Sequence, residues 1–305
     1  MICRLILTGD PMSYDPTRTT ALRARFVSQV NRRWRTVKTD LRKSIVDNDC
    51  FGIADRMVAL AALPPEELAM FLDAAKVDRF MAWLREQEEA GILETVFMPS
   101  RLSSEPWSNL YIDSAYRQGI RRAYSELHKA GYATPIPIDM AFGQPVHAQR
   151  VALLYNRTWE DLKTVAQVVN ARVRQKVTDA LSSELARGIA EGKAPKVVAK
   201  ELYAELGTIV DGIGLNRCRT IARTEIIRAH HHANILEYRQ AAKDMEVEVL
   251  VEWSTAGDER VCEKCAGMAH HTYTLDQIES MLPAHPNCRC SAIPARRATM
   301  RRRAA

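Results

Sequence analysis

The amino-acid sequence predicts a mainly α-helical protein with a small C-terminal α+β module. Apolar residues make up 47% of the 305 positions and aromatic residues only 7%, so Ala, Leu and Val supply most of the apolar mass. Ala and Leu are among the best helix formers. Apolar residues recur every three or four positions over long stretches, and this period changes to alternation after Met245. The change of period separates long helices from a compact C-terminal region.

The first part of the chain predicts three helices. Residues 17–47 place seven apolar side chains on one stripe of a helix: Leu22, Phe26, Val30, Trp34, Val37, Leu41 and Ile45. Further helices are expected over residues 65–90 and 109–130, each followed by a glycine. Three prolines and a glycine then interrupt the pattern, which predicts a linker or extended arm over residues 132–146.

The second part continues with helices and ends in a strand. Helices are expected near residues 147–191, 195–206 and 215–243, and alternation through Val247, Val249, Val251 and Trp253 predicts a strand. We therefore predict five segments along the chain: a helical, elongated N-terminal region at 1–131, a proline-rich linker at 132–146, a helical part at 147–245, an α+β module at 246–295 and a basic tail at 296–305.

The positive charge is unevenly distributed. The net charge is +6, and nine Lys or Arg stand against one acid, Asp40, between Arg18 and Lys43. This cluster predicts either contacts with DNA phosphates or a solvated helix face that packs against an acidic partner. The candidate DNA-binding side chains are Arg25, Arg32, Arg33 and Arg35.

The chain has no apolar run long enough to span a membrane and no secretory leader, so we expect no membrane partner. Synthesis in a reducing cytoplasm favours thiols or metal ligands over disulfides for the seven cysteines.

Five possible metal ligands cluster near the C-terminus. Cys262-x-x-Cys265 is followed by His285-x-x-Cys288-x-Cys290. Thiolate and imidazole are the ligands that zinc prefers, and a structural site needs four of them. We therefore predict a structural Zn²⁺ held by Cys262, Cys265, His285 and at least one of Cys288 and Cys290, in a zinc-stapled compact region.

Catalytic alternatives are weaker. The spacing lacks the histidine and glutamate patterns of nucleobase deaminases and zincins. A cysteine nucleophile at Cys262 or Cys288 stays open, and His270-His271 between the two cysteine groups leaves an HNH-like nuclease as the main enzymatic rival. His230, His231 and His232 point about 100° apart on a helix, so they cannot all bind one ion.

The motifs together resemble one family. The chain has Ala222-Arg223-Thr224-Glu225, Trp253, Asp258-x-Arg260, the cysteine pair, and His285-Pro286-x-Cys288-Arg289-Cys290 in this order. This order resembles the phage Mu F-like head morphogenesis proteins, over about residues 150–294. The resemblance marks a structural motif in this chain: Arg223, Glu225, Trp253, Asp258, Arg260 and Arg289.

The resemblance implies a minor capsid component and not an enzyme. Such a protein acts with the portal protein and the major capsid protein in head assembly, and in some members in packaging or delivery of phage DNA. It is made in the host cytoplasm and belongs to the procapsid or virion. The alternative is a metal-dependent, HNH-like DNA nuclease. We also expect Asp258 to pair with Arg260, Glu225 to reach Arg260 or Arg289, and zinc to compensate for a small core in the C-terminal module.

Overall fold

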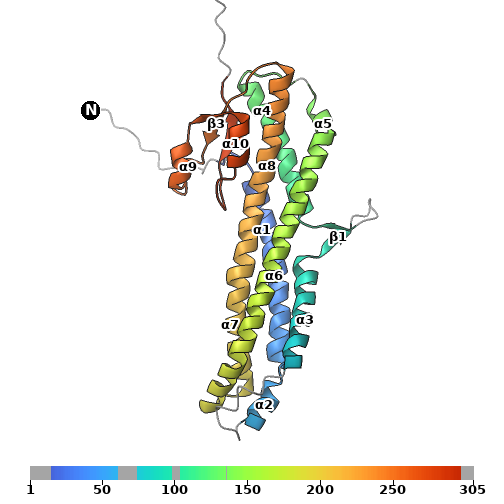
Figure 1. Cartoon of the computed structure of the whole chain (residues 1–305), viewed down its shortest axis with the longest axis vertical. Coiled ribbons are helices and arrows are strands. Elements are labelled where there is room, and N and C mark those ends of the chain that lie inside the picture. Colours follow the sequence, from blue (N-terminus) through green and yellow to red (C-terminus); the bar gives the residue numbers. More distant parts are fainter. Residues whose placement is uncertain (1–14, 61–73, 98–103, 135, 297–305) are drawn as a thin grey trace, which may run out of the picture. The chain divides into compact units, whose positions relative to one another are not determined.

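Helices dominate the computed structural model, which describes residues 15–60, 74–97, 104–134 and 136–296 (Figure 1). The chain forms two compact units, and each unit combines segments that are far apart in the sequence. The first unit takes the described parts of Met1–Ala24, Leu110–Leu154 and Arg223–Ala305. The second takes those of Arg25–Asn109 and Tyr155–Ala222. The five sequential segments expected from the sequence stay a prediction.

The second unit contains most of the long helices. It holds most of α1 (Thr20–Arg42), the π-helical turn η1 (Lys43–Asp47), α2 (Ile53–Leu60), α3 (Ala74–Ile92), the hairpin of β1 (Thr95–Phe97) and β2 (Ser104–Pro106), most of α6 (Pro145–Ala190), α7 (Pro195–Ile209) and η3 (Val210–Leu215). The apolar stripe predicted for residues 17–47 is buried, because all seven of its side chains are at most 3% exposed.

The first unit contains the C-terminal module and the helices that support it. It holds α4 (Asn109–Lys129), α5 (Ile138–Ala141), the start of α6, most of α8 (Asn216–Asp244), β3 (Val251–Ser254), α9 (Glu263–Met268), β4 (Thr272–Tyr273), α10 (Leu275–Met281) and β5 (Ser291–Pro294). The three strands form an antiparallel sheet in the order β4-β3-β5, with Val251 opposite Tyr273 and Trp253 opposite Ala292. The predicted fold class, mainly α with a small C-terminal α+β module, is confirmed.

Two helices of the first unit approach closely at a glycine. A Cβ atom at Gly119 of α4 would lie 2.5 Å from the carbonyl oxygen of His230 on α8 and 2.7 Å from the Cβ of Ala233. Only glycine allows the two helix backbones to come this near. His230 and its neighbour His231 on α8 are both buried, with exposures of 1% and 2%. Their desolvation lowers the pKa of His230 to about 4 and that of His231 to about 3, so both are neutral.

The C-terminal module shares its core with these helices. One continuous cluster of buried residues joins α4, α8, the sheet and α10: Ala123, Leu127, Ile235, Tyr238, Val251, Trp253, Cys265, Ile278, Leu282, Cys288, Cys290 and Ala292. The small core expected for the module is therefore completed by α4 and α8, a contribution that the expectation did not include. Helices distant in sequence cover its apolar face.

Several predicted elements differ from the structure in their limits. The strand predicted through Val247, Val249, Val251 and Trp253 is formed only from Val251, as β3 (Val251–Ser254). Described residues of the second predicted helix begin with α3 at Ala74, and positions 65–73 lie outside the described residues. The proline-rich segment contains the short helix α5, and α6 begins at Pro145, because proline is well suited to the first position of a helix. Residues 297–305 of the predicted basic tail also lie outside the described part of the chain.

Candidate metal centre

The five predicted ligands lie together in the first unit. The donor atoms of Cys262, Cys265 and His285 all lie within 4.8 Å of one another, and so do the sulfur atoms of Cys265, Cys288 and Cys290. Cys265 belongs to both groups and joins them. The five donors therefore form one continuous cluster of possible metal ligands.

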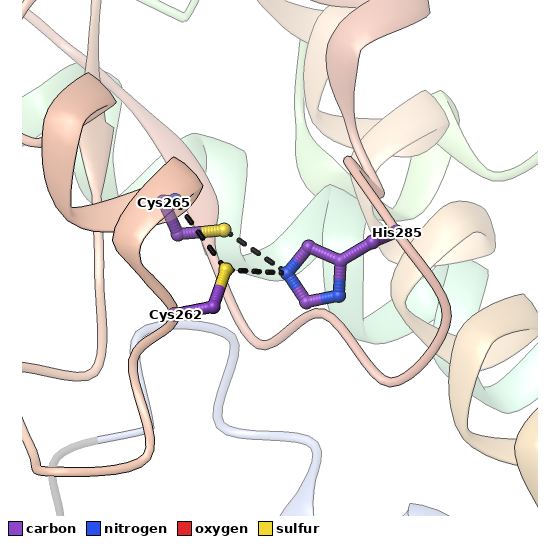
Figure 2. Close-up of side chains that lie close together, drawn as sticks. All are labelled: Cys262, Cys265 and His285. Carbon is purple, nitrogen blue, oxygen red and sulfur yellow. Dashed lines mark hydrogen bonds between the residues drawn. The ribbon is translucent and has the colours of Figure 1, made fainter.

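Cys262 and Cys265 come from the start of α9 (Figure 2). Cys262 is the N-cap residue, and its sulfur accepts a hydrogen bond from the backbone N–H of Cys265 at 3.5 Å. The two-residue spacer therefore brings both sulfurs to one side of the first helical turn. The backbone hydrogen bond, together with the His285 ring, holds the pKa of the Cys262 thiol below its ordinary value. The chain thus favours the thiolate form that a metal ion requires.

The His285 ring faces both sulfurs through one nitrogen (Figure 2). Its Nε2 lies 3.3 Å from the Cys262 sulfur and 3.1 Å from the Cys265 sulfur. Its Nδ1 lies 2.8 Å from the carbonyl oxygen of Pro286, which can only accept a hydrogen bond. The carbonyl therefore accepts a hydrogen bond from Nδ1, and Nε2 is the nitrogen that faces both sulfurs and would bind a metal ion. A backbone carbonyl commonly fixes a metal-binding histidine in this way.

A tight turn carries Cys288 back toward His285. The backbone N–H of Cys288 donates to the carbonyl oxygen of His285 at 3.1 Å, and Asn287 has a positive φ of 62°. Proline followed by a residue with positive φ is the pattern of a type II turn, in which asparagine is tolerated. The segment His285-Pro286-Asn287-Cys288 therefore forms such a turn.

Cys288 and Cys290 lie deeper than Cys262. They are 1% and 4% exposed, and Cys265 is 2% exposed. A hydrogen bond from the Cys290 side chain lowers the pKa of Cys288 to about 5, whereas the same bond raises the pKa of Cys290. Burial raises the pKa of Cys265 to about 12. Cys265 and Cys290 thus resist ionisation beside Cys288, and a bound cation would favour the thiolate form of all three.

An ion pair joins the two segments that carry the ligands. Arg289, between Cys288 and Cys290, donates two hydrogen bonds to the Asp258 carboxylate at 2.7 and 2.5 Å. Arg260 also donates to Asp258, through its backbone N–H and its guanidinium group, both at 3.1 Å. The Arg289 hydrogen bonds lower the pKa of Asp258 well below its usual range. The expected Asp258–Arg260 pair is present, and Asp258 additionally links the loop before Cys262 to the ligand turn.

The Ala-Arg-Thr-Glu segment of α8 contacts the same turn. The Thr224 hydroxyl accepts a hydrogen bond from the backbone N–H of Asn287 at 3.1 Å, and Arg223 donates to the Asn287 side chain at 3.5 Å. Glu225 is buried on α8 and pairs with Arg228 at 3.1 Å, and its expected reach to Arg260 or Arg289 stays a prediction. Sequence reasoning missed Thr224 and Asn287, since their contact joins positions 63 residues apart.

The remaining predicted site residues have separate places. Trp253 is fully buried in the core of the module. On α1, the side chains of Arg25, Arg32 and Arg35 are exposed. Arg33 is 6% exposed; its guanidinium lies 4.3 Å from the centre of the Trp107 ring and 3.0 Å from Glu94. Because Arg33 is buried and paired, it cannot present its charge to a phosphate as predicted.

The His270–His271 pair lies at the surface. The His270 side chain is 85% exposed and its Nδ1 lies 2.7 Å from the Glu252 carboxylate. In the described part of the chain, His270 and His271 belong to neither group of possible metal ligands.

Within the described residues, no helix combines the length and apolar character needed to cross a membrane.

Residues 179–293 match the family described as Phage Mu protein F like protein. Comparison with curated proteins gave no significant match. Comparison with solved structures also gave none. The family match contains all five cluster ligands together with Arg223 and Asp258, and it confirms the resemblance inferred from the sequence.

Proposed function

Because residues 179–293 belong to the Phage Mu protein F-like family, we propose that this protein is a minor component of the phage head that acts in head assembly. The observation that carries the proposal is the family match over the segment that builds the Cys/His cluster and its supporting ion pair. The proposed partners are other head proteins, namely the portal protein and the major capsid protein. The proposed location is the procapsid or virion.

We propose that the Cys/His cluster holds a structural zinc ion. The donors are thiols and one imidazole, which suit Zn²⁺ and not the oxygen-preferring Mg²⁺ or Ca²⁺. Cys262, Cys265 and His285 would supply three ligands, and either Cys288 or Cys290 the fourth. When bound, zinc would supply a strong link between α9 and the ligand turn. With four protein ligands, it would have no position left for a reactive water molecule.

The proposed role is therefore non-catalytic. An HNH-like nuclease would require His270 or His271 to act beside a metal that binds DNA phosphate. The His270 contact with Glu252 lies at an exposed site outside the ligand groups. Incubation of the purified protein with plasmid DNA and Mg²⁺ tests this alternative. Cleavage that disappears in the His270→Ala, His271→Ala double variant would replace the assembly role with an enzymatic one.

The assembly role is tested in a phage that lacks this gene. We expect fewer infectious particles or defective heads, and recovery when the gene is supplied from a plasmid. Mass spectrometry of purified procapsids and virions should detect the protein in at least one of them. Normal titres together with its absence from both particles would contradict the proposal.

We further propose that α1 contributes a salt-sensitive contact to phage DNA. Arg25, Arg32 and Arg35 are exposed on α1 and spaced seven and three residues apart, so they lie on neighbouring positions of one side of the helix. Arg33 is no longer included, because it is buried against Trp107.

Replacement of these three arginines by Gln should reduce the salt dependence of DNA affinity, by about 0.9 in the logarithmic slope for each phosphate that is no longer neutralised. A matched control is Lys129→Gln, which removes one exposed cation from α4. An unchanged slope in the triple variant would show that these cations serve a protein interface or only face water.

A further inference from the structure

The four thiols of the metal centre differ in how far solvent reaches them. Cys262 is exposed, whereas Cys265, Cys288 and Cys290 are each at most 4% exposed. A small oxidant dissolved in water therefore meets the Cys262 sulfur first. Oxidation of a cysteine follows its exposure and its thiolate character, and a thiol bound to a metal ion is a thiolate. Cys262 combines both properties when the proposed zinc ion is bound.

A second thiol lies within reach of the Cys262 sulfur. Among the described residues, Cys265 is the thiol that shares a donor group with Cys262. The two sulfurs lie within 4.8 Å of each other, and both contact Nε2 of His285 (Figure 2). A disulfide bond is about 2 Å long, so the two sulfurs need to approach by less than about 3 Å. The two-residue spacer is that of redox-active Cys-x-x-Cys motifs.

A disulfide between these cysteines would dismantle the zinc site. Zinc binds cysteine as the thiolate, and neither sulfur of a disulfide is a thiolate. Of the five donors, His285, Cys288 and Cys290 would be left, whereas a structural zinc site needs four protein ligands. Oxidation of the pair would therefore release the ion. It would also remove the link through the metal between α9 and the turn that carries His285.

We propose that Cys262 and Cys265 form a redox switch of the zinc site, in which a peroxide oxidises the pair to a disulfide and the ion is released. The switch rests on the proposed structural zinc. The proposed location supplies the change of conditions, because a head protein is made in a reducing cytoplasm and enters oxidising surroundings when the particle is released.

The reaction has two steps. The Cys262 thiolate attacks one oxygen of hydrogen peroxide, the O–O bond breaks and hydroxide leaves, so that Cys262 becomes a sulfenic acid. The Cys265 thiolate then attacks the Cys262 sulfur, the S–O bond breaks, and a second hydroxide leaves as the S–S bond forms. The two sulfurs together lose two electrons, which peroxide gains, and each hydroxide takes up a proton to become water. A thiol reductant reverses the oxidation.

Hydrogen peroxide added to the full chain, purified without chelator, tests the switch. A chromogenic zinc indicator follows the released ion, and thiol titration of the denatured protein counts the thiols that are lost. We expect about one zinc ion to be released for every two thiols lost. Dithiothreitol with added Zn²⁺ should restore both the thiols and the bound ion.

Peptide mapping without reductant identifies the oxidised pair. Trypsin cleaves after Lys264 and so separates Cys262 from Cys265, which means that their disulfide joins two peptides. A second cleavage after Glu279 separates Cys265 from Cys288. The oxidised chain should yield the link between Cys262 and Cys265, and the reduced chain should not.

A matched control removes a thiol outside the site. Cys50 belongs to neither ligand group, so Cys50→Ser should release zinc and form the same link as the wild type. Loss of the response in Cys50→Ser would overturn the assignment of the switch to the metal centre.

The remaining outcomes separate the switch from the zinc site. A wild-type chain without zinc before oxidation would overturn the proposed ion and the switch together. A chain that holds zinc and keeps it in excess peroxide would overturn the switch alone. Zinc release without a disulfide, or with a disulfide between other cysteines, would also overturn the switch and leave the zinc site standing.

Discussion

A buried carboxyl group in the second unit gives a quantitative prediction about stability. Glu88 of α3 is 1% exposed, and one of its oxygens accepts a hydrogen bond from the Asn170 side chain of α6. Among the described residues, its other oxygen has no hydrogen-bond partner. Desolvation by burial, with a smaller contribution from the charge of Glu89, raises the pKa of Glu88 from 4.5 to about 8. The folded chain therefore keeps this carboxyl group protonated at neutral pH.

The free energy follows from the difference in proton affinity. Glu88 holds its proton more tightly in the folded chain than in the unfolded chain. Its contribution to the free energy of unfolding is therefore fully present below about pH 4.5 and declines as the pH rises toward about 8. Each pKa unit is worth about 1.4 kcal/mol, so the interval from 4.5 to pH 7 removes about 3 kcal/mol. Glu88→Gln keeps an oxygen for Asn170 and carries no titrating proton.

Urea unfolding of the two proteins between pH 4 and 8 measures this difference. Glu88→Gln should match the wild type near pH 4 and exceed its free energy of unfolding by about 3 kcal/mol at pH 7. The control is Glu86→Gln on the exposed side of α3, which should leave the pH dependence unchanged. A wild-type stability that does not fall relative to Glu88→Gln as the pH rises would refute the reasoning.

Other contacts give further predictions. Gly119→Ala should lower the free energy of unfolding by about 1–3 kcal/mol, because its Cβ would meet the backbone of α8. At Gly207 an added Cβ would meet nothing within 4 Å, so Gly207→Ala should raise the free energy of unfolding by up to about 1 kcal/mol. Urea unfolding measures both glycine variants. Asp258→Asn should weaken zinc binding about tenfold in chelator competition, because Arg289 loses its paired carboxylate. If Asp258→Asn binds zinc as tightly as the wild type, the Asp258–Arg289 ion pair does not support the metal centre.

The sequence predicted the helices well, because each apolar stripe is a local property of its own segment. The prediction for residues 109–130 and the observed α4 (Asn109–Lys129) differ by one residue. The grouping of segments into units was not predicted. The choice of neighbours for α4 depends on contacts such as Gly119 with α8, and these join positions more than 100 residues apart. The core shared by the C-terminal module and α8 was missed for the same reason.

The possible metal ligands of the candidate site could be predicted from the sequence, whereas the contacts of the residues around them could not. Zinc ligands are chemically distinctive and closely spaced, so Cys262, Cys265 and the later His/Cys group could be named from the sequence. The ion pair of Glu225 with Arg228 was not predicted, although the two residues lie three positions apart on one helix. Arg33 looks like its exposed neighbours in the sequence, and only the position of Trp107 shows that it is buried.

The most direct test of the metal centre is the zinc content of protein purified without chelator. Elemental analysis should find about one zinc per chain. Cys265→Ser should lose the metal and lower the thermal unfolding midpoint, because structural zinc contributes roughly 10 kcal/mol or more to folding. Cys50→Ser, whose thiol lies outside both ligand groups, should keep the zinc. A metal-free wild-type protein that is fully folded, with all its thiols freely reactive, would contradict the central claim.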